Sequence, residues 1–307
     1  MMEPGLRRSQ RRISVLLTTA MVAGLMVGGT TVAEAGRAGC KVTNVRTGAS
    51  YAGLARAIKT AAAADVLSIA NTCIGRFLIT KSLTLSGASA AATLNGNGSG
   101  TVVFIVPGVT LTIAQLTITG GLATSGGGIY NNGTLTLGSG VTVSGNQATN
   151  GGGIYNGGSV SLGDGVSVSG NTGGSGGGIY NDLNASVTIA GSASVSGNTA
   201  NVAGGVGGGI YNLAGSVAIS GSATVSGNTA DTNGGGISNG ANATLTLSGS
   251  ASVTGNQVLG SGGVGGGIFT LGALTLLDAA APCANTPDDV ADPGSLLVDN
   301  SSAYPCA

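Results

Sequence analysis

The stretch GGGIYN at residues 126–131, followed by TLTL at 134–137 and VTVSGN at 141–146, is the unit that most of this chain repeats. Its isoleucine returns every 25–31 residues after a Gly-Gly-Gly triplet, at Ile129, Ile154, Ile179, Ile210, Ile237 and Ile268. An asparagine that follows Ser-Gly or Thr-Gly returns in step with it, at Asn146, Asn171, Asn198, Asn228 and Asn256. A repeat of this length, built from short strand-like runs, predicts a solenoid.

Apolar residues alternate with serine and threonine inside each unit. Leu135 and Leu137 flank Thr136, and Val141 and Val143 flank Thr142. Period two places the apolar side chains on one face of a strand and the hydroxyls on the other. We therefore predict an all-β parallel β-helix with three short strands per coil, in which about nine coils stack at about 4.8 Å. Each coil would bury its inner face against its neighbours.

Two asparagine columns run through the repeats. One follows the isoleucine by two residues, at Asn131, Asn156, Asn181, Asn212 and Asn239, and ends at Thr270. The other is the Ser/Thr-Gly-Asn column, Asn146 to Asn256. Glycine and asparagine tolerate the backbone angles of tight corners, and stacked amides can hydrogen-bond from coil to coil. We interpret both columns as structural ladders.

An outward column lies between the isoleucine and the asparagine of each unit. It reads Tyr130, Tyr155, Tyr180 and Tyr211, and then Ser238 and Phe269. Stacked aromatic rings could stiffen one corner of the coils. Alternatively, the four tyrosines could form a binding stripe for sugar or protein, since aromatic side chains dominate interfaces.

The motifs VSGNQA at 143–148 and GGI at 152–154 resemble the paired Phe-x-x-Asn and Gly-Gly-Ala-Ile motifs of polymorphic outer-membrane protein repeats. Valine stands in place of the motif's phenylalanine and glycine in place of its alanine. More broadly, residues 117–270 resemble bacterial secreted β-helix proteins with the pectin-lyase-like fold. The resemblance implies a right-handed parallel β-helix and does not by itself imply an activity.

Residues 1–35 have the pattern of a signal peptide. Arginines at positions 7, 8, 11 and 12 precede an uncharged run, and Ala33-Glu34-Ala35 is an A-x-A cleavage site. The alternative is an uncleaved membrane anchor. We expect a secreted, extracellular or cell-surface protein whose mature chain has no membrane span.

Three further segments follow the signal peptide. Residues 36–81 are expected to form an N-terminal cap, with a helix that begins after Ser50 as its N-cap and covers the open end of the coils. Residues 82–277 are the β-helix repeats. Residues 278–307 are expected to form a last coil, with Leu297-x-x-Asn300 in the ladder position, and a closing cap.

The four cysteines lie in the two terminal segments and none lies among the repeats. We expect the disulfides Cys40–Cys73 and Cys283–Cys306, one in each cap. Neither a C-x-x-C spacing nor a histidine occurs, so a zinc site is not expected.

Charge is scarce and unevenly placed. No lysine, arginine or histidine follows Lys81. Nucleic-acid binding requires a basic surface, and the repeats have none. From Gly36 the chain has seven basic and nine acidic residues, a net charge of −2.

Candidate catalytic residues are few. Asp164, Asp182 and Asp231 are the acids of the repeats, and they occupy three different columns. Glycosidases need two carboxylates close together, and hydrolytic triads need a base that the repeats lack. Asp288, Asp289 and Asp292 with Asn285 could bind Ca²⁺ or form a solvated loop, and the loop is the interpretation adopted. We expect no cofactor and no metal, and whether the protein is an enzyme stays open, with the balance against it.

These features favour a secreted or cell-surface, non-catalytic β-helix rod that has a structural, adhesion or surface-binding role. Its partner would be a polysaccharide or a surface protein, and the rod itself a monomer. The alternative is a carbohydrate-active enzyme or a polysaccharide-binding protein of the pectin-lyase-like class. A further alternative is an ice-binding protein, because the serine and threonine columns form hydroxyl arrays.

Overall fold

The computed structural model describes residues 39–277, 281–293 and 297–299. The chain divides into two units, residues 1–35 and residues 36–307, and the fold described below belongs to the second. The predicted signal peptide lies outside the described residues. Its cleavage therefore stays a prediction.

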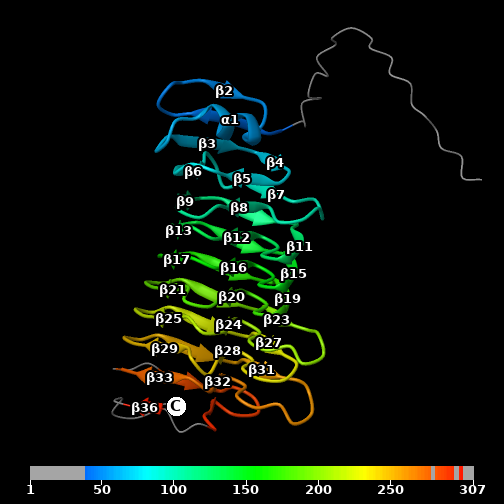
Figure 1. The fold of residues 1–307 in the computed structure, drawn as a ribbon, viewed down its shortest axis with the longest axis vertical. Coiled ribbons are helices and arrows are strands. Elements are labelled where there is room, and N and C mark those ends of the chain that lie inside the picture. The colour runs from blue at the N-terminus through cyan, green and yellow to red at the C-terminus, as the bar shows by residue number, and fades with distance from the viewer. Residues whose placement is uncertain (1–38, 278–280, 294–296, 300–307) are drawn as a thin grey trace, which may run out of the picture. The chain divides into compact units, whose positions relative to one another are not determined.

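The described residues between 39 and 299 form a parallel β-helix of about eight turns, close to the nine expected (Figure 1). Its strands belong to four sheets that run along the stack of coils. Sheet 1 contains β2 (Ser50–Tyr51), β1 (Lys41–Asn44), β3 (Val66–Ala70), β6 (Leu83–Gly87), β9 (Thr110–Ala114), β13 (Thr134–Leu137), β17 (Ser159–Leu162), β21 (Ser186–Ile189), β25 (Ser216–Ile219), β29 (Thr244–Leu247), β33 (Ala273–Leu276) and β36 (Leu297–Asp299).

Sheets 2 and 3 complete the three strands per coil that the sequence predicts. Sheet 2 contains β4 (Thr72–Ile74), β7 (Thr93–Asn95), β10 (Thr117–Thr119), β14 (Thr142–Ser144), β18 (Ser167–Ser169), β22 (Ser194–Ser196), β26 (Thr224–Ser226), β30 (Ser252–Thr254) and β34 (Ala281–Cys283). Sheet 3 contains β5 (Phe77–Ile79), β8 (Val103–Ile105), β12 (Ile129–Asn131), β16 (Ile154–Asn156), β20 (Ile179–Asn181), β24 (Ile210–Asn212), β28 (Ile237–Asn239), β32 (Ile268–Thr270) and β35 (Val290–Ala291).

A fourth sheet was not predicted. Sheet 4 contains β11 (Leu122–Ser125), β15 (Gln147–Asn150), β19 (Thr172–Ser175), β23 (Thr199–Ala200), β27 (Thr229–Ala230) and β31 (Gln257–Val258). These strands carry no alternating apolar pattern, and β15 buries only Ala148. Backbone pairing between coils forms them, which is why hydrophobic periodicity did not reveal them.

Adjacent coils pair in parallel with equivalent residues side by side. Leu135 pairs with Val160, and Leu137 pairs with Leu162. Leu135 and Leu137 are fully buried, and so is Val143 of sheet 2. The predicted inward columns are therefore confirmed as one continuous apolar core.

The N-terminal cap is present, but its helix begins later than predicted. Helix α1 spans Leu54–Thr60 and buries Leu54, Ala57 and Ile58. Gly53 is its N-cap and makes no side-chain capping bond. Ser50 instead begins β2, which pairs antiparallel with β1, so the predicted Ser50 cap is wrong.

Covalent and ionic contacts hold the cap. The predicted Cys40–Cys73 disulfide is present and joins residues 33 apart in the sequence. Buried Asp65 accepts hydrogen bonds from Arg46, Asn44 and the backbone N–H of Ala62. These hydrogen bonds hold the pKa of Asp65 well below its usual range, and the bond from Arg46 has the largest effect. The second predicted disulfide includes Cys306, which lies outside the described residues, and stays a prediction.

The C-terminal coil differs from the prediction. Leu297 belongs to β36, which pairs with β33 in sheet 1, so Leu297-x-x-Asn300 does not occupy the ladder position. Pro282 pairs with Val253 in sheet 2 instead, which places Asn285 in the ladder. No alternating pattern marks this strand, because a proline occupies its inward position.

Candidate functional site

The asparagine after the isoleucine forms a buried ladder. The Nδ2 of Asn131 donates to the Oδ1 of Asn156 at 2.8 Å, and the same bond repeats at 2.8 Å for each pair through Asn239. The ladder ends when Asn239 donates to the hydroxyl of Thr270 at 3.1 Å. All five amides are fully buried, so they, and not water, form the hydrogen bonds of the neighbouring backbone groups.

The Ser/Thr-Gly-Asn column forms a second ladder. In its middle, the Nδ2 of Asn198 donates to the Oδ1 of Asn228 at 3.0 Å and to the carbonyl of Val168 at 2.9 Å. The Oδ1 of Asn198 accepts from the backbone N–H and the Nδ2 of Asn171. Of the two residue types expected at the corners, the glycine before the asparagine takes the left-handed backbone angle, such as Gly197 at φ +60°.

The residues weighed as Ca²⁺ ligands, and interpreted instead as a solvated loop, contact the end of this second ladder. Asn256 donates to Asn285 at 3.0 Å, and Asn285 donates to Asp289 Oδ1 at 2.9 Å from both its backbone N–H and its Nδ2. Asp289 thus takes the position of the next asparagine. Asp288 Oδ1 accepts from the backbone N–H of Gly265 and Gly266. These carboxylates serve as acceptors for the last coils.

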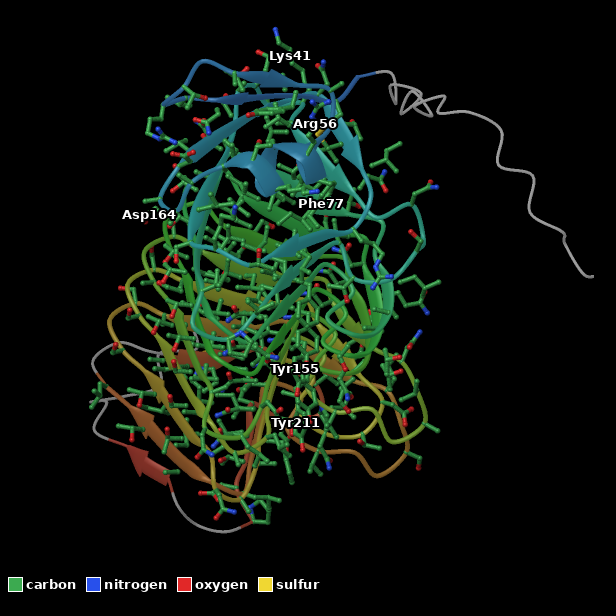
Figure 2. The ribbon with its side chains drawn as sticks, turned by 45° about the horizontal axis from the view of Figure 1, so that its top comes forward. Lys41, Arg56, Phe77, Tyr155, Asp164 and Tyr211 are labelled. Atoms are coloured by element: carbon green, nitrogen blue, oxygen red, sulfur yellow. A yellow bond between two sulfur atoms is a disulfide. The ribbon has the colours of Figure 1, made fainter. Side chains whose placement is uncertain are left out.

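The predicted tyrosine column lies on the outer face of sheet 3 (Figure 2). Its rings are half-buried and stack along the coils. Ring centroids are 4.7 Å apart for Tyr130 and Tyr155, and 5.3 Å apart for Tyr155 and Tyr180, with interplanar angles of 16° and 14°. Tyr180 and Tyr211 meet edge to face at 5.2 Å and 71°.

The column is longer than the sequence predicted. Phe104 of β8 pairs with Tyr130, and their rings stack at 4.7 Å and 2°. Leu78 of β5 pairs with Phe104 and is 54% exposed. At the other end Ser238 and Phe269 follow Tyr211, as predicted. No glycine triplet precedes β5 or β8, so only the spacing of these strands from the repeats could have placed Leu78 and Phe104 in the column. We call the column from Leu78 to Phe269 the aromatic row.

The stacking of the rings determines which parts of the aromatic row a partner can contact. Tyr130 and Tyr155 are each stacked on both faces by neighbouring rings, so only their ring edges are open to a partner. An open approach to a ring exists at the N-terminal end, where Arg76, Phe77, Leu78, Thr101 and Phe104 line a shallow, mainly apolar groove. A sugar ring could therefore not stack on the middle tyrosines without displacing a neighbour.

One carboxylate lies against the aromatic row. The hydroxyl of Tyr155 donates a hydrogen bond to Asp182 Oδ2. Burial, and then this bond, raises the pKa of Tyr155. Burial and the charge of Asp182 raise the pKa of Tyr180 to about 12, and burial raises that of Tyr211. These phenols therefore stay protonated at neutral pH.

The other two acids of the repeats lie at different corners. Asp164 lies between sheets 1 and 2 and accepts from the backbone N–H of Ser192 at 3.0 Å (Figure 2). Asp231 follows β27 in sheet 4 and accepts from the backbone N–H of Gly204 at 2.8 Å. The fold does not bring either acid to Asp182, so the three do not form a carboxylate pair.

The described residues show neither a metal-binding cluster nor a membrane-spanning helix. No group of three acidic, cysteine or histidine side chains there could hold a metal ion. No helix within those ranges has the length and apolar character to cross a membrane.

No protein-family model, curated protein or solved structure matches this chain. The β-helix itself is established by strand pairing, and the resemblance of the repeat motifs supplies no activity.

Proposed function

We propose that this protein is a non-catalytic, secreted or cell-surface β-helix rod that binds its partner along the aromatic row. The observation that carries the proposal is the continuity of the row, which presents half-buried aromatic side chains on successive coils. One coil offers too little area for a stable contact, whereas a stripe over several coils can approach interface size. Aromatic side chains are also the residues most enriched at binding hot spots.

The geometry of the aromatic row favours one kind of partner. Half-buried rings lie on successive coils, so a partner would be an extended chain that contacts the ring edges along the row and hydrogen-bonds the phenols that Asp182 leaves open. The repeats contain no cation to attract an anionic polymer, and Asp182 would repel one. A neutral polysaccharide has the matching chemistry.

The proposed location rests on the sequence of residues 1–35 and on the disulfide. Stable structural disulfides form in oxidising compartments, and Cys40–Cys73 closes the cap at the end nearest the proposed cleavage site. Export would also place the aromatic row where polysaccharides are found.

Binding to a panel of immobilised neutral and anionic polysaccharides tests the proposal. The variant replaces Tyr130, Tyr155, Tyr180 and Tyr211 by serine, which the same column already contains at Ser238. The matched control replaces four outward residues of sheet 2 by alanine, Thr142, Ser167, Ser194 and Thr224. We expect the tyrosine variant to lose binding to a neutral polymer while keeping its circular dichroism spectrum, and the control to bind normally.

Two results would contradict the proposal. One is equal binding by the tyrosine variant and the control. The other is turnover of a polysaccharide that disappears when Asp164, Asp182 or Asp231 is replaced by asparagine, because it would establish the carbohydrate-enzyme alternative.

A further inference from the structure

The repeats contain very few side chains that react with oxidants. The chain has no tryptophan and no histidine, and its four methionines, at positions 1, 2, 21 and 26, precede the proposed cleavage site. Cysteine and methionine are the usual first targets of oxidation, and within the described ranges no cysteine is free. Oxidising equivalents that reach the described repeats therefore meet tyrosine first, and four of the six tyrosines lie in the aromatic row.

Tyr155 and Tyr180 have the geometry and the chemistry to react together. Their rings lie 5.3 Å apart at an angle of 14°, on adjacent coils whose backbones are paired. Both are half-buried and thus reachable from solvent. Holding two reacting groups next to each other makes their coupling effectively unimolecular, which can be worth a large factor in rate.

Asp182 distinguishes this pair from the rest of the aromatic row. Its carboxylate accepts the phenol hydrogen of Tyr155. The equivalent positions after the ladder asparagine are Asn132, Gly157, Leu213, Gly240 and Leu271. None of these can take a proton at neutral pH. A phenol is far easier to oxidise when its proton can leave with the electron, and a base within hydrogen-bond reach provides that path.

We propose that the pair Tyr155 and Tyr180 is a site of oxidative crosslinking, in which a one-electron oxidant joins two adjacent coils by a carbon–carbon bond. The oxidant is a peroxidase supplied with hydrogen peroxide. Tyr155 loses one electron to the oxidant and its phenol proton to Asp182, and Tyr180 loses one electron to the oxidant and its proton to water. The two phenoxyl radicals couple at the ring carbons next to their oxygens.

The balance of the reaction is complete. After coupling, each ring loses the hydrogen from its bonded carbon as a proton and regains its hydroxyl proton, which restores both aromatic rings. The two tyrosines thus lose two electrons and two protons in total, and hydrogen peroxide takes them up to give two water molecules. The rings must rotate out of their stack to form the biaryl, and side chains that are not fully buried change rotamer rapidly.

The test uses dilute monomeric protein treated with a peroxidase and hydrogen peroxide. We expect an intact monomer that is lighter by two hydrogen atoms, with dityrosine fluorescence. Digestion should yield one crosslinked peptide pair that contains Tyr155 and Tyr180. The variants Tyr155→Phe and Tyr180→Phe should each lose this pair, whereas Tyr51→Phe should keep it.

Two further samples separate this mechanism from general tyrosine oxidation. Asp182→Asn should retain the fold and form the crosslink at least several-fold more slowly. Protein unfolded in guanidinium should lose the preference for this pair. The proposal is overturned if crosslinks join only different molecules, if they form equally at Tyr51, if Asp182→Asn reacts at the wild-type rate, or if no crosslink forms while peroxide is consumed.

Discussion

Tyr130 and Asn131 are neighbours in one strand, and their two columns follow opposite rules. The asparagine column points inward and keeps its residue in five successive coils, from Asn131 to Asn239. The tyrosine column points outward and changes from tyrosine to serine over the same five coils. Inside, each amide completes the hydrogen bonds of backbone groups that water cannot reach. Outside, water can replace any side chain.

The comparison teaches which residues carry the fold and which are available for function. At the end of the inward column, Thr270 replaces asparagine. Its hydroxyl accepts a hydrogen bond from Asn239 and donates one to the carbonyl of Gly272, so it ends the ladder. The outward column accepts the loss of a whole ring at Ser238.

Removing one amide from the middle of a ladder should be the most damaging change. Asn198→Ala leaves the carbonyl of Val168 and the N–H of Asn171 without their side-chain partner, whereas the amide oxygen of Asn228 keeps the backbone N–H of residue 198. Each buried unpaired group costs about 1–3 kcal/mol, so we expect a loss of about 3–4 kcal/mol in the free energy of unfolding, measured by denaturant melts. A loss no larger than that of an outward substitution would refute the structural role of the ladder.

A glycine pair extends the contrast to the backbone. A Cβ on Gly208 would lie 2.4 Å from the carbonyl oxygen of Gly235 in the next coil, whereas a Cβ on Gly227 would meet only the backbone nitrogen of Gly197, at an ordinary contact distance of 4.0 Å. Overpacking costs about 1–3 kcal/mol, so Gly208→Ala should lower stability by about 3 kcal/mol. Gly227→Ala, at φ +61°, should cost about 1 kcal/mol through its backbone angle alone. Equal melting curves for the two variants would mean that the coils do not approach this closely.

Outward substitutions should have small effects on stability. Tyr180→Ser removes the stacking with Tyr155 and the edge contact with Tyr211, worth about 1 kcal/mol beyond the area buried. Thr224→Ala, on the outer face of sheet 2, should change stability by no more than about 0.5 kcal/mol. The ordering of Asn198, Tyr180 and Thr224 variants in one series of melts checks the assignment of inside and outside.

The smallest effect should be a dependence on alkaline pH. The pKa of Tyr180 is raised from 10.0 to about 12, so the folded state holds this proton more tightly than the unfolded chain. The stability that this provides is complete below pH 10 and is lost as the pH rises through the folded value. Tyr180→Phe should flatten this part of the stability profile, and a variant with an unchanged alkaline slope would contradict the burial of the phenol.

The sequence alone predicted most of the fold, because alternation and repetition report directly on buried strand faces. Leu135, Val143 and Asn131 could each be placed inward from their columns. Ser50 could not be placed, because its pattern as a helix cap competes with pairing to β1, which depends on residues distant in the sequence. The fourth sheet was equally hidden, since its strands form through the backbone.

The candidate site was only partly visible in the sequence. The four tyrosines were predicted as one column, but the extension to Phe104 and Leu78 required the register of coils that have no glycine triplet. The contact between Tyr155 and Asp182 joins neighbouring coils through their side chains, and no periodicity encodes it. Asp289 was considered as a metal ligand because its position at the end of a ladder could not be foreseen.

The most direct test of the whole account compares Asn198→Ala with the four-tyrosine serine variant in one binding experiment, at a temperature where both are folded. The account predicts that the asparagine variant, although less stable, binds a neutral polysaccharide as the wild type does. It predicts that the tyrosine variant keeps most of its stability and loses binding. Loss of binding in the asparagine variant together with normal binding in the tyrosine variant would contradict the division between a structural interior and a working aromatic row.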